Sequence, residues 1–452
     1  MAYRLVLISP VDPTHAGIAG SRPGRFPPLG LAMVAATTPP GWEIDLVDEN
    51  VKPFTYRDAD LVGLTSFTAT APRAYQIASE YRRRGIPTVM GGIHASMVTD
   101  EALDYVDTVV RGEAEEVWPQ VIADFEQGHM ERVYQGKYAE LPGMAWPRRD
   151  LISDGYLFAT IQTSRGCPMD CEFCSVTAFN GHHFRQRPVS EVLDELESMP
   201  QEKVFFVDDN ITGFGEAGER RAMELFQGMI DRRLNKQWWC QASIDFGHNE
   251  ELLRLAAAAG CRMVLLGVEA EDAGALTELG KKLNLKAGVD GYGQLFRRIN
   301  RHGIAVLGAF ISGTDTDTRE SIDRRHRYIA RNNGINVMQV TFLTPLPGTR
   351  LFDRLKREDR LLYTNFPKDW SRYDFTEVLH RPRMIDRYDL MERGYSALKR
   401  MYSWPSILRK TFTTLLRTRS AVTATWVHRF NVAYRDIGFA AARVALRNRS
   451  QE

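Results

Sequence analysis

The chain has 452 residues, of which 44% are hydrophobic and 25% are charged, and its formal net charge at pH 7 is +1. This composition is typical of a soluble globular protein with room for two or three domains. The small net charge argues against a dedicated nucleic-acid-binding protein, which usually carries a strong basic excess. Because no apolar run approaches the roughly 20 residues that span a bilayer, we expect no integral membrane segment.

The five cysteines are too few for a disulfide framework and favour a reducing, intracellular setting. The apolar run at the amino terminus is too short for a signal peptide and predicts a first strand. We therefore expect a cytoplasmic protein. Three of the cysteines lie close together in the sequence, whereas Cys240 and Cys261 are interpreted as core residues.

The first 140 residues alternate short apolar runs with helical stretches, which predicts a doubly wound parallel sheet with helices on both faces. The expected strands are residues 4–9, 43–47, 61–65, 87–91 and 107–110, and the expected helices are residues 29–38, 72–84 and 113–125. Ligands of such sheets bind near the carboxyl ends of the strands. Two of these ends carry small or hydroxyl residues that let a large flat ligand approach closely, namely Thr65 and Ser66, then Gly91 and Gly92 before His94. Two ordinary strand–helix turns are the alternative interpretation.

A connection with two prolines and a glycine follows at residues 141–157 and is interpreted as an interdomain linker. Beyond it, residues 163–176 read TSRGCPMDCEFCSV, which places Cys167, Cys171 and Cys174 in a C-x₃-C-x₂-C spacing. Soft sulfur ligands suit an iron–sulfur cluster or zinc. Three thiolates fit three corners of a 4Fe–4S cluster and leave the fourth iron open, as catalysis requires.

Two other interpretations of this motif stay open. A closed zinc site needs a fourth ligand, which His182 or His183 could supply. The three cysteines could also be unrelated buried residues, although a chain with only five makes such a cluster improbable by chance.

Residues 158–350 alternate six apolar strands with helices, which predicts a partial parallel barrel of six βα units. The expected strands are residues 158–163, 203–207, 237–242, 262–268, 304–311 and 336–342. Because the chemistry of such barrels lies at the carboxyl ends of the strands, the polar residues there are site candidates. These are Asp208, Asp209, Asn210, Gln241, Ser243 and Glu269. A helix N-cap is the alternative for the acidic pair, whereas a lone buried glutamate is costly without a partner.

Residues 351–452 are expected to form a mostly helical extension that is basic and amphipathic. From Met401 onward, nine Lys or Arg residues face only two acidic residues and are interleaved with aromatic and aliphatic ones. Such a pattern fits a surface helix on anionic lipid. A helical cap over the mouth of the barrel is the alternative.

The C-x₃-C-x₂-C spacing, with Phe173 before its last cysteine, is identified as the signature of the radical S-adenosylmethionine (SAM) superfamily. The resemblance implies that three cysteines hold a 4Fe–4S cluster and that SAM binds the fourth iron. One electron then cleaves SAM to methionine and a 5′-deoxyadenosyl radical. The resemblance also implies cofactor contacts for the residues at the strand ends: Asp208, Asp209 and Asn210 with the amino group of SAM, Glu269 with its ribose or carboxylate end, and Phe310 with adenine. Ser243, at the end of the third strand, is a further candidate for cofactor binding.

The first 140 residues resemble the cobalamin-binding domain that precedes many radical SAM cores, and share residues 27–31, 48–51, 91–96 and 112–115 with it. The resemblance implies that Thr65, Ser66, Gly91 and Gly92 line a cobalamin site, and that His94 orients a loop or hydrogen-bonds the corrin edge. The best-known cobalamin proteins bind cobalt through the histidine of a D-x-H-x-x-G motif. Residues 12–17 miss that spacing by one and leave His15 as its counterpart. A vestigial domain without the cofactor is the alternative.

The carboxyl-terminal part, including Trp370 and Tyr402, resembles the extension of radical SAM proteins of hopanoid biosynthesis and similar lipid-modifying enzymes. Together these resemblances imply a cobalamin-dependent methyltransferase that acts on an unactivated carbon of a small hydrophobic substrate such as a lipid, an isoprenoid or a tetrapyrrole. They imply a reducing electron donor such as flavodoxin or ferredoxin, and peripheral contact with the inner face of the membrane. They single out no acid–base catalytic residue.

Three other functions stay open at this point. The same cofactors could serve an oxidative cyclisation, as in relatives that resemble the anaerobic tetrapyrrole ring-forming enzyme. The radical core could also form a carbon–carbon bond without cobalamin. The third alternative is a non-catalytic module that holds zinc or a cluster.

Overall fold

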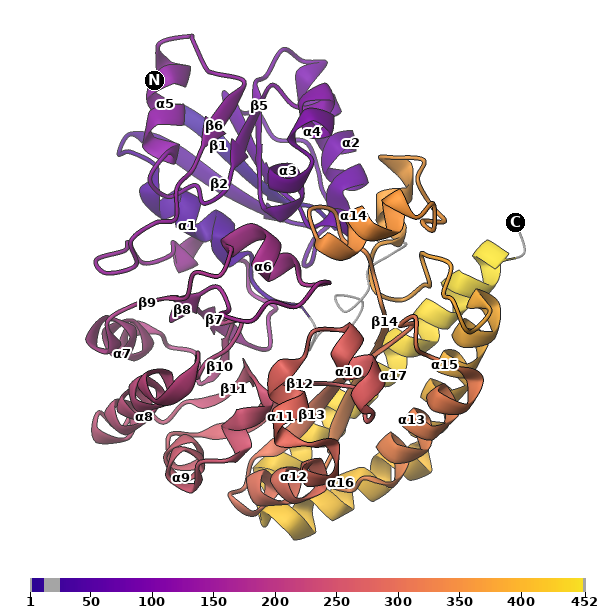
Figure 1. Cartoon of the computed structure of the whole chain (residues 1–452). Coiled ribbons are helices and arrows are strands. Elements are labelled where there is room, and N and C mark those ends of the chain that lie inside the picture. The colour runs from indigo at the N-terminus through magenta and orange to yellow at the C-terminus, as the bar shows by residue number, and fades with distance from the viewer. Residues whose placement is uncertain (1, 12–24, 450–452) are drawn as a thin grey trace.

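The computed structural model describes residues 2–11 and 25–449. Two parallel sheets of six strands each follow one another along the chain, and a helical extension completes the molecule (Figure 1). Among the described helices, none combines the length and the apolar character needed to cross a bilayer.

The amino-terminal sheet has the strand order β2-β1-β3-β4-β5-β6, and all of its pairs are parallel. Its strands are β1 (Tyr3–Ser9), β2 (Trp42–Asp48), β3 (Leu61–Thr65), β4 (Thr88–Gly91), β5 (Thr108–Arg111) and β6 (Val133–Gln135). The chain reverses its direction of growth between β1 and β3, which is where a doubly wound sheet opens a crevice for a ligand.

Helices cover both faces of this sheet. One apolar layer lies beneath α1 (Leu29–Thr37) and α5 (Trp118–Glu126). The other lies beneath α2 (Ala71–Arg82) and α4 (Thr99–Tyr105), with the short helix α3 (Ile93–Met97) before α4. The predicted doubly wound domain is thus confirmed, although α5 begins later than the predicted helix at 113–125.

The second sheet has the order β14-β13-β12-β11-β10-β7, in which each strand pairs in parallel with its neighbours. Its strands are β7 (Ala159–Ile161), β10 (Lys203–Phe206), β11 (Gln237–Ala242), β12 (Cys261–Glu269), β13 (Ala305–Ser312) and β14 (Val337–Phe342). Its intervening helices are α6 (Ser175–Asn180), α7 (Val189–Ser198), α8 (Gly215–Asp231), α9 (Glu250–Ala258), α10 (Ala273–Glu278), α11 (Lys282–Ala287), α12 (Tyr292–Arg301) and α13 (Arg319–Arg331). The predicted partial barrel of six βα units is therefore confirmed.

The carboxyl-terminal extension contains α14 (Arg350–Arg357), the 3₁₀ helix η7 (Lys368–Arg372), α15 (Arg387–Met401), α16 (Trp404–Thr418) and α17 (Ala421–Arg449). Helix α17 runs along β12, β13 and β14 (Figure 1). Its buried residues Trp426, Val427 and Phe430 pack against the inner face of the barrel. The Trp239 and Phe430 rings, for example, lie 5.6 Å apart.

The apolar residues of the basic tail thus have different surroundings on α17 and on α16. The aromatic residues of α17 fill the barrel, because alternate strand residues such as Phe205 and Trp239 point inward and need apolar partners. The apolar residues of α16, by contrast, include several exposed ones such as Phe412.

Replacing Phe430 with alanine tests the role of α17 in the core. Because the ring is only 4% exposed, we expect Phe430→Ala to lower the free energy of unfolding by about 3–5 kcal/mol. The matched control is Phe412→Ala on α16, whose ring is 60% exposed and whose loss should change stability by about 0.5 kcal/mol or less. Urea denaturation measures both, and equal effects would contradict the assignment.

Candidate active site

The three clustered cysteines lie at the carboxyl end of the barrel, on a loop between β8 (Ser164–Arg165) and α6. Cys171 is buried, whereas Cys167 and Cys174 are partly exposed. Gly166 has a φ of +85°, and a side chain there would meet the His183 carbonyl at 2.0 Å. A glycine is therefore required directly before Cys167 for the loop to close on β9 (Arg185–Gln186).

The acidic pair after β10 holds this loop. The fully buried Asp208 carboxylate accepts hydrogen bonds from the Thr163 amide at 2.9 Å and from the Ser164 amide and hydroxyl. Asp209 accepts a hydrogen bond from the Gly166 amide at 3.2 Å. Burial, and then the charge of Asp208, raise the pKa of Asp209 to about 6. The structure thus gives these carboxylates the role of fixing the cysteine loop, beside their predicted contact with SAM.

Helix α14 holds the same loop from the other side. Arg350 donates to Asp170 at 2.6 Å and Arg354 donates to Glu172 at 2.7 Å, so that two ion pairs bracket Cys171. No sequence pattern indicates these pairs, because their partners lie about 180 residues apart.

Glu269, at the end of β12, is paired with Lys281, a residue that sequence reasoning missed. The Lys281 ammonium lies 2.9 Å from a Glu269 carboxylate oxygen, and both side chains are largely buried. Burial alone would lower the pKa of Lys281, but the charges of Glu269 and of the Cys171 thiolate raise it. Lys281 therefore stays protonated beside the cysteines.

An unusual backbone conformation at Glu269 directs its side chain toward Lys281. Glu269 has a φ of +62°, a left-handed conformation that is uncommon outside glycine, and the pairing of β12 with β13 shifts register there. A side chain at Gly267 would meet both the Glu269 carboxylate and the Lys281 ammonium. Strain of this kind is concentrated at functional sites.

The pKa values of two of the three cysteine thiols lie above the ordinary value. Burial raises the pKa of Cys167 to about 11, and the neighbouring cysteines add to the effect. Burial also raises the pKa of Cys171, although the positive charge of Lys281 opposes it. Metal binding at such thiols must release protons, since the thiolate is the ligand.

Two aromatic candidates have different surroundings. Phe173 packs with Leu279, Ile311 and Leu351 next to the cysteine loop. Phe310 is fully buried in the core between the barrel and its outer helices. The expected contact of Phe310 with adenine is therefore corrected: because neighbouring strand residues face opposite sides, Ile311 faces the site and Phe310 faces the helices.

Asn210 and Ser243 join the ends of two strands. The Asn210 amide donates to the Ser243 hydroxyl at 2.9 Å, and its carbonyl accepts from the Ser243 amide at 3.3 Å. Gln241 donates to the Asp208 carbonyl at 3.4 Å. Hydrogen bonds thus connect the candidate site residues that follow β10 with those at the end of β11.

The candidates of the amino-terminal domain meet at the carboxyl ends of β3 and β4. Gly92 has a φ of +91°, and a side chain there would lie 2.7 Å from the Thr65 hydroxyl and 3.0 Å from the Ser66 carbonyl. The Ser66 hydroxyl is buried without a hydrogen-bond partner in the described residues. A glycine is therefore required where α3 begins, because its backbone packs against Thr65 and Ser66. The unpartnered Ser66 hydroxyl and the small residues of this cradle are compatible with the expected corrin site.

His94 takes part in a buried cluster between the domains. Its ring Nε2 lies 3.1 Å from the Tyr75 hydroxyl, and the Glu101 carboxylate accepts hydrogen bonds from Tyr75 and from the indole of Trp370. Burial lowers the pKa of His94, so a neutral ring is expected. The structure thus gives His94 a role in orienting α3, and its contact with a corrin stays a prediction. His15 lies outside the described residues.

The two candidate sites face each other. Helix α3, which begins after Gly92, contacts α6, which begins after Cys174 (Figure 1). Glu113, at the carboxyl end of β5, binds both Arg185 and Arg165, and the latter pair measures 2.8 Å. Burial alone would raise the pKa of Glu113, but hydrogen bonds from Arg185 and the charge of Arg165 lower it. The carboxyl ends of the two sheets therefore lie next to each other, joined by these contacts.

The donor set at the cysteines fits a cluster with one open iron better than a single zinc ion. In residues 2–11 and 25–449, no three His, Cys, Asp or Glu side chains converge as ligands of one ion. The thiolates of a cluster bind different irons and need no such convergence. His182 instead approaches Asp170, and the His183 ring lies against Tyr138. The Glu269–Lys281 pair offers both charges to a zwitterionic ligand such as the methionine part of SAM.

Comparison with known proteins gives the same assignment for both domains. Residues 16–122 match the B12 binding domain family and residues 161–329 match the Radical SAM superfamily. The bacteriochlorophyllide d C-12(1)-methyltransferase of Chlorobaculum tepidum is 29% identical over 85% of this chain and 84% of its own. The hopanoid C-2 methylase of Rhodopseudomonas palustris is 28% identical over 84% of this chain and 73% of its own.

Among solved structures, the cobalamin-dependent S-adenosylmethionine radical enzyme OxsB has a similar fold, with a TM-score of 0.69 over 97% of this chain and 72% of its own at 12% identity. The chain is thus a radical SAM protein with a preceding B12-binding domain. The cofactors of this combination of domains are a 4Fe–4S cluster, SAM and cobalamin.

Removal of the Glu113 charge tests the link between the domains. Glu113→Gln leaves Arg165 and Arg185 without a buried counter-charge, so we expect a loss of about 3 kcal/mol in stability. Glu43→Gln, which breaks an exposed pair with Arg4, is the control and should change stability by about 1 kcal/mol or less. Urea denaturation measures both variants, and an unchanged Glu113→Gln protein would contradict a stabilising role for the pair.

Proposed function

We propose that the protein is a cobalamin-dependent radical SAM methyltransferase that adds a methyl group to an unactivated carbon of a hydrophobic substrate. The observation that supports this proposal is that the carboxyl ends of the two sheets lie together, where α3 contacts α6 and Glu113 binds Arg165 and Arg185. A substrate held between the two ends would be close to both cofactors.

When bound, the cofactors would supply a strong hydrogen-atom acceptor, a methyl donor and a centre that passes on electrons from an external donor. Cys167, Cys171 and Cys174 hold the cluster in this proposal, and Phe173 packs beside it. Lys281 and Glu269 bind the carboxylate and ammonium ends of SAM, and Asp208, Asp209, Asn210 and Ser243 form the connected group that shapes its site. The hydrophobic residues around Phe173 exclude water from the reacting groups.

The cobalamin site in this proposal is the cradle formed by Thr65, Ser66, Gly91 and Gly92. Phe67 follows Ser66 and is 75% exposed, which is unusual for a phenylalanine at the end of a buried strand. A flat apolar ring at this place is suited to lie against a corrin. His94 supports the cradle through α3.

The substrate class rests on the relatives, one of which acts on a bacteriochlorophyllide and another on a hopanoid. A low-potential electron donor such as flavodoxin or ferredoxin is the expected partner, because cleavage of SAM consumes an electron. We also include peripheral contact of the carboxyl-terminal part with a membrane in the proposal.

Anaerobic reconstitution tests the proposed function. We expect about four irons per chain, cobalamin absorption, and release of 5′-deoxyadenosine and S-adenosylhomocysteine with a methylated product. A cyclised product without S-adenosylhomocysteine would support oxidative cyclisation instead. Deoxyadenosine release without bound cobalamin would support a cobalamin-free enzyme, and iron without deoxyadenosine release would support a binding module.

Substitution of the cysteines tests the cluster. Replacing Cys167, Cys171 or Cys174 with alanine should remove the reconstituted cluster absorption and all deoxyadenosine release, because each thiolate binds one iron. Cys240→Ala is the control, since Cys240 is buried in the core between strands and helices and should leave the iron content unchanged. Retained turnover in any of the three variants would refute the assignment.

Substitution of Lys281 tests the proposed SAM site. Lys281→Met removes the cation beside Glu269 and should raise the Kd for SAM by about tenfold or more, which corresponds to loss of one charge-assisted hydrogen bond. Lys281→Arg keeps the charge and should recover most of the affinity. Isothermal titration of the reconstituted protein with SAM measures both. Equal affinity in wild type and Lys281→Met would exclude the proposed contact.

A further inference from the structure

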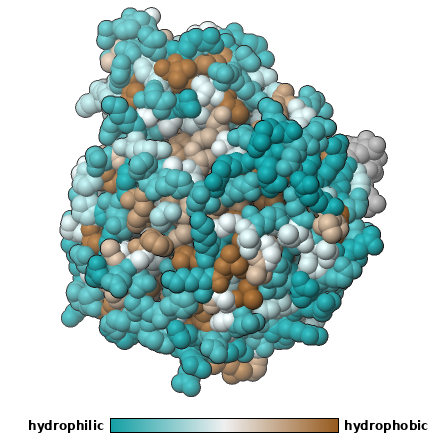
Figure 2. All heavy atoms as spheres, in the orientation of Figure 1, coloured by the Kyte–Doolittle hydropathy of each residue, from teal (hydrophilic) through white to brown (hydrophobic). Residues whose placement is uncertain are grey.

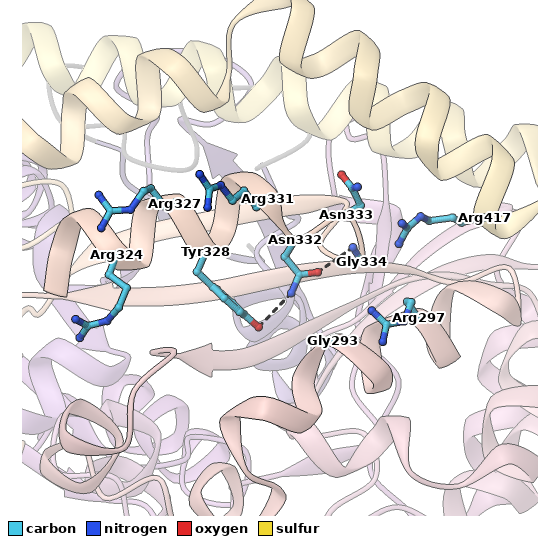
Figure 3. Close-up of a pocket in the computed structure, with 10 residues that line it drawn as sticks. All are labelled: Gly293, Arg297, Arg324, Arg327, Tyr328, Arg331, Asn332, Asn333, Gly334 and Arg417. Carbon is cyan, nitrogen blue, oxygen red and sulfur yellow. Dashed lines mark hydrogen bonds between the residues drawn. The ribbon is translucent and has the colours of Figure 1, made fainter. Parts of the chain in front are cut away.

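A cleft lined by five arginines lies between helices α12, α13 and α16 (Figure 3). Its volume is about 510 Å³. Arg324, Arg327 and Arg331 project from α13, and Arg297 and Arg417 reach in from α12 and α16. The Asn332 side chain, which donates to the Tyr328 hydroxyl at 3.1 Å and accepts from the Gly334 amide at 2.9 Å, fixes its floor.

The charge of this cleft is largely uncompensated. Arg324 approaches Glu271 at 3.6 Å. Within the part of the chain that the structure describes, no ion pair is formed by Arg297, Arg327, Arg331 or Arg417. Four arginines without acidic partners, together with Arg324, gather in one concave site and mark a site for an anion.

The exposed apolar face of α16 borders this cleft. Trp404, Leu408, Phe412, Leu415 and Leu416 are between 40% and 61% exposed. Since one helical residue turns by about 100°, these five side chains share one face of α16. Arg409 and Arg417 lie between that face and the buried face of Ile407 and Thr414. In Figure 2, apolar residues emerge at the lower edge of the molecule, where Figure 1 places α16.

We propose that the arginine cleft and the apolar face of α16 together form a docking site for an anionic phospholipid surface. The arginines bind headgroup phosphates, and the aromatic and aliphatic side chains enter the interface beside them. This docking site is where the membrane contact of the proposed function would be made, and the proposal therefore rests on that function. It does not depend on methyl transfer.

Two other occupants fit the surface less well. A nucleic acid would use the arginines but would leave the apolar face of α16 exposed. A second copy of this chain, bound symmetrically through the same face, would bring two uncompensated arginine clusters together. A lipid surface satisfies both the charge and the apolar residues.

The docking site is remote from the candidate active site. Arg331 and Asn332 end α13 just before β14 begins, and α12 likewise precedes β13. The cleft therefore lies at the amino ends of the strands, whereas the cysteines lie at the carboxyl end. The surface anchors the enzyme and is not a substrate entrance, so its variants should leave the chemistry intact.

Vesicle flotation of the full-length protein tests the proposal, with phosphatidylcholine vesicles compared with vesicles that also contain phosphatidylglycerol. We expect binding to the anionic vesicles only, decreasing with salt. Arg327→Glu with Arg331→Glu should weaken it at least about tenfold, and Phe412→Ser with Leu416→Ser should also weaken it. The control, Arg83→Glu with Lys137→Glu, makes the same change of net charge at exposed sites outside the cleft and should bind as wild type does.

Four results would overturn the proposal. One is absence of binding to anionic vesicles, and another is equal loss of binding in the control and cleft variants. The third is displacement by inorganic phosphate far beyond that by sodium chloride of equal ionic strength, which would indicate a site for a small soluble phosphate. A change of oligomeric state in Phe412→Ser with Leu416→Ser, measured by light scattering, would assign the face to a second copy. Deoxyadenosine release without vesicles is measured in parallel, so that loss of chemistry and loss of docking are told apart.

Discussion

Buried ion pairs that fix the cysteine loop between two sheets are the constraint on which the rest of the structure depends. Arg165 and Arg185 flank the loop and bind Glu113 of the amino-terminal domain. Arg350 and Arg354 bind the loop from α14. Because a buried charge is costly without its partner, the Glu113 pairs disfavour separation of the elements that they join, whereas the more exposed pairs of α14 contribute less. The cluster-binding loop is therefore held relative to the cobalamin-type domain and not only to its own barrel.

This arrangement explains why the site contains few groups of obvious acid–base function. Lys281, Glu269, Asp208 and Asp209 are engaged in holding charge or backbone in place. A site that positions reactive cofactors needs fixed geometry and exclusion of water more than proton transfer. The strained backbone of Glu269 and the close approach of Gly92 to Thr65 both serve positioning.

The sequence was sufficient to predict both sheets, because apolar periodicity is a local property. The cysteine spacing is local as well, and it is the basis on which the cluster ligands are proposed. It could not show the partners of Glu269 or of Asp170, since Lys281 and Arg350 approach them only through the tertiary fold. Phe310 was misassigned because the side that a strand residue faces depends on register, which a run of apolar residues does not reveal. The tail pattern likewise did not separate the buried aromatic residues of α17 from the exposed ones of α16.

The central claim is that the cluster and cobalamin occupy one interdomain space. Electron paramagnetic resonance of the reconstituted protein, with the cluster reduced and cobalamin in its paramagnetic cobalt(II) state, tests this claim most directly. We predict a resolved magnetic interaction between the two centres. A spectrum equal to the sum of the two isolated centres would contradict the account.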